Sequence, residues 1–162
     1  MQKRTARRIF LMRPMIPSRF LFFLLLSATP CLAGGPPVRI ERGWVRAVPG
    51  SSTDTAAYMT LFNDGDTPLR LTGGATPIAG SIMPMITTTR TVDGEKVLGM
   101  KGVDALVVPA YGKLVLEPNG NHLMVMDLKQ HPRPGDRVKL TLHFEPGAAE
   151  LTLDLPAAMA QP

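Results

Sequence analysis

Histidine and methionine side chains recur at alternating positions in two segments of the chain. In GNHLMVM, a β-strand would place His122, Met124 and Met126 on one face. The segment MPM repeats this spacing with Met83 and Met85. Thioether sulfur is a soft, uncharged ligand that suits Cu(I) and suits Zn(II) or Mg(II) poorly, and imidazole can complete a mixed site. Methionine also fills gaps in hydrophobic cores, so these residues alone leave a packing role open.

Other kinds of site chemistry find little support in the sequence. The chain has a single cysteine, Cys31, which excludes a disulfide framework and a zinc site built from several cysteines. His131 lies in a turn rich in proline, and His143 lies on the polar face of a predicted strand, so both are expected at the surface. We find no Ser/His/Asp or Cys/His arrangement of recognisable spacing and no paired-carboxylate motif. The sequence therefore favours a binding protein over an enzyme.

Short segments of alternating apolar and polar residues, separated by Gly, Pro, Asn and Asp, predict an all-β sandwich or barrel of antiparallel strands. The pair Asp93-Gly94 predicts a hairpin, and Met100 lies in its second arm. Pro84 cannot donate to a central ladder, which predicts that its strand lies at a sheet edge. The expected strands cover residues 38–40, 44–48, 56–62, 69–72, 81–91, 96–101, 105–108, 113–117, 122–128, 137–144 and 149–155.

The first 33 residues have the features of a signal peptide. Six basic residues precede the apolar run FLFFLLL, which is too short to span a bilayer, and Cys31-Leu32-Ala33 fits the small-residue site that signal peptidase cleaves. We therefore expect a signal peptide over residues 1–33 and a single mature domain over residues 34–162, periplasmic or secreted. Cleavage changes the net charge from +5 to −1, which removes any general attraction to nucleic acid or anionic membrane. Lipid attachment at Cys31 is the alternative, which Pro30 directly before it fits poorly.

From about Gly43 to Leu155 the sequence resembles the PCuAC family of periplasmic copper chaperones. The landmarks are GWVRA, AYMT before the turn NDGD, TPIA, EPNGNHLMVMDLK, and GD before the strand that ends at Phe144. The family's motif is a His or Met, ten residues, a Met, twenty-one residues, and then His-x-Met. Met100, His122 and Met124 match the last three positions without adjustment. The resemblance implies a cupredoxin-like β-sandwich that binds Cu(I).

The first ligand position departs from this motif. At the family's distance before Met100 the sequence has Thr89, which is no soft ligand. Aligning the TPIA segment with its counterpart places Met85 at the His/Met position and lengthens the hairpin by four residues, through a longer arm or a β-bulge near residues 87–90. Met83 points to the same side and is the alternative to Met85. The metal site implied by the resemblance is Met85, Met100, His122 and Met124.

The expected function is that of an exported carrier that delivers Cu(I) to a copper-accepting protein, such as a subunit of a respiratory oxidase or another copper chaperone. A neutral thioether set can hold Cu(I) and release it to a thiolate-bearing acceptor by ligand exchange. We expect the site at the solvent-facing edge of the sandwich, so that loss of His122 or Met124 leaves the fold intact. An electron-transfer cupredoxin is disfavoured because the mature chain has no cysteine for a blue-copper bond. The alternative is an exported β-sandwich interaction module without metal.

Overall fold

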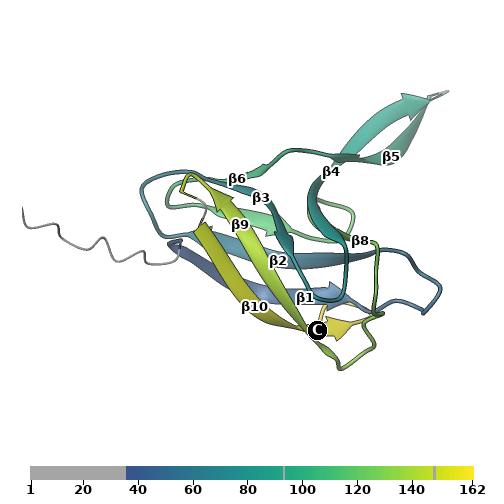
Figure 1. Ribbon diagram of the computed structural model, residues 1–162. Coiled ribbons are helices and arrows are strands. Elements are labelled where there is room, and N and C mark those ends of the chain that lie inside the picture. The colour runs from purple at the N-terminus through teal and green to yellow at the C-terminus, as the bar shows by residue number, and fades with distance from the viewer. Residues whose placement is uncertain (1–35, 93, 148) are drawn as a thin grey trace, which may run out of the picture. The chain divides into compact units, whose positions relative to one another are not determined.

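The computed structural model describes residues 36–92, 94–147 and 149–162, so the predicted signal peptide and Cys31 lie outside the described residues. Within these ranges the chain forms ten strands, which confirms the expected all-β fold (Figure 1). No helix in the described part of the chain has the length and hydropathy needed to cross a membrane. The strands are β1 (Val38–Arg46), β2 (Thr55–Asn63), β3 (Leu69–Ala75), β4 (Ser81–Val92), β5 (Glu95–Gly102), β6 (Leu106–Val108), β7 (Lys113–Leu116), β8 (His122–Met126), β9 (Arg137–Glu145) and β10 (Ala149–Ala158).

The strands form a ladder in the order β5-β4-β8-β2-β1-β10-β9-β3-β6 (Figure 1). In addition, β7 pairs with β2. The pairs are antiparallel except β1 with β10, which run parallel. A further pairing of β3 with β4, at Gly74 and Ile82, brings the two ends of the ladder together. The sheet therefore closes on itself around a common core.

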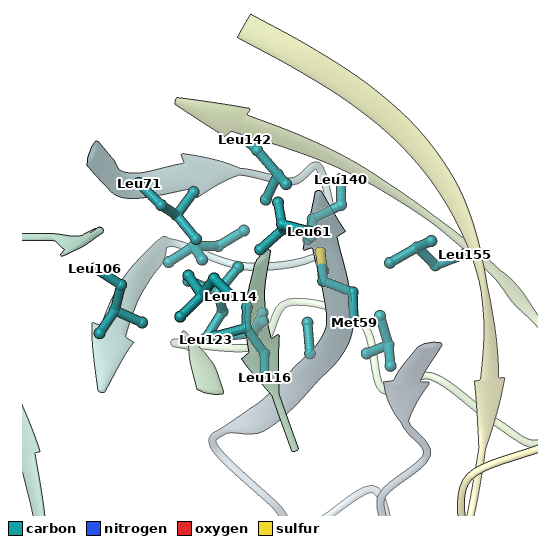
Figure 2. Close-up of a cluster of buried hydrophobic side chains, with 14 of the residues drawn as sticks. Met59, Leu61, Leu71, Leu106, Leu114, Leu116, Leu123, Leu140, Leu142 and Leu155 are labelled. Carbon is teal, nitrogen blue, oxygen red and sulfur yellow. The ribbon is translucent and has the colours of Figure 1, made fainter. Parts of the chain in front are cut away.

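Alternate residues of the strands fill this core. On β9, Val138 and Phe144 are almost fully buried, while Lys139, which follows Val138 and points to the other face, is exposed. Figure 2 shows leucines from several strands packed together with Met59, which is 1% exposed. Burial of one such side chain contributes about 1.5–3 kcal/mol. Met59 thus has the core-filling role that is common for methionine.

Strand β1 is continuous where the sequence predicted two pieces. Glu41 pairs with Thr60 and Trp44 with Tyr58, so β1 has one extra residue between these pairs. The extra residue makes a β-bulge in which Arg42 adopts a positive φ of 54°. The bulge changes which face of β1 is buried, and this change interrupts the alternation in the sequence.

Strand β4 exchanges partners along its length. It pairs with β3 at Ile82, with β8 from Ser81 to Met85, and with β5 from Met85 to Val92. The pairing with β5 runs without a register shift up to the turn, so the hairpin has a longer arm and no bulge. Figure 1 shows this hairpin extending beyond the rest of the sandwich.

The expectation that Pro84 marks an edge strand is wrong. Pro84 is buried and pairs with Leu123 of β8, while its carbonyl oxygen accepts a hydrogen bond from the N–H of Val103 at 3.0 Å. The nitrogen and oxygen of one strand residue point to the same side. The missing N–H of Pro84 would therefore point away from β8, toward the side where the partner of β4 changes from β3 to β5. The hydrogen bonds between β4 and β8 do not need it.

Candidate metal centre

The pairing of β4 with β8 places five soft donors on one face, four of them in two directly opposed pairs and the fifth, Met126, opposite Ser81. Met83 lies directly opposite Met124, and Met85 lies directly opposite His122. Directly opposed residues of an antiparallel pair share a face, as do alternate residues along each strand. The intervening Leu123 points the other way and is fully buried in the core. The two strands therefore present their soft donors on one face, while the side chains on the opposite face, such as Leu123, are packed in the core.

Strand β5 adds the remaining predicted ligand to this face. Met100 lies opposite Thr87, which is two residues beyond Met85 on the same face of β4. Met100 is 63% exposed, the opposite of what a core-filling methionine would show. All four predicted ligands and the alternative, Met83, therefore face the same side of the sheet.

Three of the predicted ligands line one pocket. Met100, His122 and Met124 border a cavity of about 370 Å³, together with Thr87 and Tyr58. These ligands come from β5 and β8, more than twenty residues apart in sequence. The cavity has room for a metal ion and for side-chain rearrangement around it.

Met85 stands beside this pocket and does not line it. A β-carbon built on Gly102, the residue opposite Met85 on β5, would lie 3.6 Å from the sulfur of Met85. The same point lies 3.3 Å from the sulfur of Met83. Both thioethers therefore lean toward β5, and Met85 must rotate about its side-chain bonds to join His122.

The ring of His122 is held in one orientation. Its Nδ1 lies 2.9 Å from the carbonyl oxygen of Gly120, which can only accept, so Nδ1 carries the hydrogen. The lone pair of Nε2 is then free to bind a metal, the arrangement that second-shell carbonyls usually enforce. The hydroxyl of Thr87 donates to the same Gly120 oxygen at 2.9 Å. This carbonyl therefore links the turn before β8 to β4.

His122 is only 5% exposed, so the expectation that it lies on a solvent-facing edge is wrong. The ring centroid of Tyr58 lies 6.2 Å from that of His122, and Trp44 packs on Tyr58 at 4.7 Å. These two aromatic residues and Ala56 form a small cluster of their own beside the main core. Tyr58 therefore lies against the histidine from the β2 side, while His122 borders the pocket that it shares with Met100.

Tyr58 was not singled out from the sequence, although it borders the pocket. Burial raises the pKa of its hydroxyl above the ordinary value, and the nearby charge of Arg46 partly opposes this effect. The guanidinium of Arg46 lies 5.4 Å from the centre of the Tyr58 ring. The phenol therefore stays protonated at neutral pH and offers no anionic oxygen to a metal. Only the pairing of β2 with β8, opposite Met124 at Ala56, brings this residue to the site.

The other histidines lie outside the site. The His143 side chain is 41% exposed and its Nε2 lies 3.6 Å from a carboxylate oxygen of Glu150, as expected for a surface residue. His131 is half-buried, and its Nε2 lies 2.9 Å from the carbonyl oxygen of Ser52. In the described ranges no three His, Cys, Asp or Glu side chains gather closely enough to hold a metal. The two thioethers and the imidazole that border the pocket, from Met100, Met124 and His122, fit Cu(I) better than Zn(II) or Mg(II).

Known proteins resemble this chain in sequence and in fold. A family model described as "Putative lipoprotein LpqE-like" matches residues 38–157. "Putative lipoprotein Lxx21020" from Leifsonia xyli subsp. xyli is 29% identical over 111 residues, which cover 68% of this chain and 64% of the relative. The chain thus spans just under two thirds of the length of that curated relative.

Solved structures share the sandwich. The copper-bound PCuAC domain from PmoF2 has a TM-score of 0.62 and 27% identity, covering 80% of this chain and 97% of that domain. The solution structure of CuI-DR1885 from Deinococcus radiodurans has a TM-score of 0.60 and 40% identity, covering 78% of this chain and 82% of that one. This agreement confirms the cupredoxin-like β-sandwich. The chain belongs to the LpqE-like family, and its sandwich is a PCuAC domain.

Proposed function

We propose that this protein is an exported copper chaperone that holds Cu(I) on the shared face of β4, β5 and β8. The observation that carries this proposal is the convergence of Met100, His122 and Met124 on one pocket. The copper-bound PmoF2 domain and the Cu(I) form of DR1885 support copper as the cargo. The lipoprotein descriptions of the relatives support export.

The ligands of the proposed site are Met85, Met100, His122 and Met124, with Met83 as the alternative to Met85. Thioether and imidazole donors are neutral, so the bound ion keeps its single positive charge. Arg46 and Asp54 also border the pocket, and their opposite charges largely offset one another there. Such a site stabilises Cu(I) through soft ligand bonds and not through charge pairing.

Delivery follows from the unequal exposure of the ligands. His122 is buried and hydrogen-bonded, whereas Met100 is 63% exposed on the projecting hairpin. A thiolate of an acceptor protein can displace the exposed thioether first, and each exchange forms one copper–sulfur bond as another breaks. The acceptor we propose is the copper centre of a respiratory oxidase or a second copper chaperone. The protein acts as a carrier in this scheme and performs no catalytic step.

The test is a Cu(I) titration of the exported protein under anaerobic, reducing conditions, with a chromophoric chelator as competitor. We expect one tightly bound Cu(I) per chain and X-ray absorption features of mixed sulfur and nitrogen ligation. The double variant Met100→Leu/Met124→Leu should lose this binding. Met159→Leu, which changes an exposed methionine beyond β10, should bind copper as the parent does. Absence of Cu(I) binding in the parent would instead support an interaction module without metal.

A further inference from the structure

The site face carries two soft donors that the proposed site does not use, Met83 and Met126. Met83 is 38% exposed and lies two residues before Met85 on the same face of β4. Its partner across the β4–β8 pair is Met124, but its sulfur leans toward β5 instead. At this exposure the thioether is accessible to a ligand from solvent. Met83 is therefore available for a role outside the pocket, which it does not line.

Gly102 supplies the space in which this sulfur lies. A β-carbon at position 102 would come within 3.3 Å of the sulfur of Met83 and 3.6 Å of that of Met85. The backbone of Gly102 does not have a positive φ, so the conformation itself does not demand glycine. The absence of a side chain at Gly102 leaves room for the thioethers of Met83 and Met85 to lie next to the β5 backbone at this residue.

We propose that Met83 and Met85 form a second, thioether-only Cu(I) position over Gly102, beside the His122 pocket. This inference rests on the proposed function and adds to it a route for the ion. Two soft thioethers suit Cu(I) and reject harder divalent ions. Because this position lacks the imidazole, it binds more weakly than the pocket.

Met85 belongs to both positions, which connects them. It faces Gly102 on one side of β4 and His122 on the other. Copper that enters at Met83 and Met85 keeps its bond to Met85 while the bond to Met83 is replaced by one to His122. The ion stays Cu(I) throughout, since each step exchanges one neutral ligand for another. The exposed position thus loads the buried one.

The experiment uses His122→Asn as the background. The asparagine side-chain amide can still donate to the Gly120 oxygen, but the metal-binding Nε2 is gone. With methyl-¹³C methionine, we expect Cu(I) to bind this variant about tenfold or more weakly than the parent and to shift the methyl signals of Met83 and Met85. The methyl signal of buried Met59 serves as the internal reference.

Adding Gly102→Ala to His122→Asn should weaken the remaining binding, because the new methyl group would lie 3.3 Å from the sulfur of Met83 and 3.6 Å from that of Met85, so the Met83 sulfur must move. Gly50→Ala is the matched control, because Gly50 does not border the pocket and its β-carbon would meet no atom within 4 Å. Met83→Leu in the same background should have the effect of Gly102→Ala without altering the backbone, and circular dichroism checks that each variant folds.

The outcomes separate this inference from the proposed function. If the residual Cu(I) binding of His122→Asn is unchanged by Gly102→Ala or Met83→Leu, the second position is overturned and the chaperone proposal stands. If the methyl signal of Met83 does not move with Cu(I), the same conclusion follows. If the parent protein binds no Cu(I), the proposed function fails and this inference fails with it.

Discussion

At the scale of single residues, the burial of His122 links copper binding to stability. His122→Ala removes the donor to the Gly120 oxygen and leaves space beside Tyr58. We expect it to lower the free energy of unfolding of the metal-free protein by about 1–3 kcal/mol. His122→Asn, which keeps a donor in place, should cost less than His122→Ala, yet both should lose tight Cu(I) binding. Urea unfolding beside chelator competition measures the two effects separately.

His143→Ala is the matched control for this pair of variants. The His143 side chain is 41% exposed on the polar face of β9, so its replacement should change stability by no more than about 0.5 kcal/mol and leave copper affinity intact. Equal stability of His122→Ala and the parent would show that the hydrogen bond to Gly120 contributes nothing measurable. Unchanged copper affinity in both His122 variants would remove the histidine from the site.

The two methionines of the MPM segment should differ in the otherwise unchanged protein. Met85 lies opposite His122, and Met83 lies opposite Met124. Met100 pairs with Thr87, so Met85 is two residues along β4 from this pair and Met83 is four. We therefore expect Met85→Leu to weaken tight Cu(I) binding more than Met83→Leu does, as measured by chelator competition. Leucine conserves volume, so neither change should cost more than about 1.5 kcal/mol of stability. A larger effect from Met83→Leu would reverse the assignment of the fourth ligand.

At the scale of elements, the sequence predicted nearly every strand, because alternation and turn residues act locally. The segment from Val138 to Phe144 and the hairpin around Gly94 are examples. Partners distant in sequence could not be predicted in this way: nothing near His122 indicates that β8 pairs with both β2 and β4. That pairing brings Tyr58 over the histidine, so the soft donors were predictable but the burial of His122 was not. Pro84 was misjudged for the same reason, since its strand changes partners at that residue.

The outer part of the β4–β5 hairpin should be dispensable for copper binding. The four residues Arg90, Thr91, Lys96 and Val97 are exposed and form two adjacent cross-strand pairs. Deleting them removes two residues from each arm, which preserves the alternation of faces and leaves ten residues between Met85 and Met100. We expect stability to change by about 0.5 kcal/mol or less and Cu(I) affinity to be retained. Thermal unfolding and chelator competition provide the measurements.

A deletion of only Arg90 and Thr91 is the contrasting variant. It shortens one arm alone, so the pairing beyond Thr89 must shift or loop out. If the four-residue deletion abolished copper binding while the protein stayed folded, the outer arm would have to contact the ion or hold Met100 in place. That result would contradict the view that the extra length is an appendage.

At the scale of the whole molecule, the site combines ligands held against the core, His122 and Met124, with an exposed ligand, Met100. Behind His122 and Met124, Leu123 and Val125 are packed into the core with 0% and 1% exposure. Met100 lies on a strand whose residues are mostly exposed. A ligand pair anchored by the core can keep the ion while the exposed ligand is exchanged, and this division suits a protein that must both hold copper and release it.

Processing of the N-terminus decides where this site operates. We expect cleavage after Ala33, so that the mature protein begins at Gly34, carries no lipid and has a net charge of −1. The lipoprotein descriptions of its relatives make acylation of Cys31 the competing outcome, which would fix the site to a membrane surface. Intact mass of the exported protein distinguishes the two, because an acylated chain would begin at Cys31 and carry added acyl mass. Cys31→Ser should leave both the mass of the mature protein and its recovery in the soluble periplasmic fraction unchanged. A shift of the parent protein, but not of this variant, to the membrane fraction would overturn the expected processing.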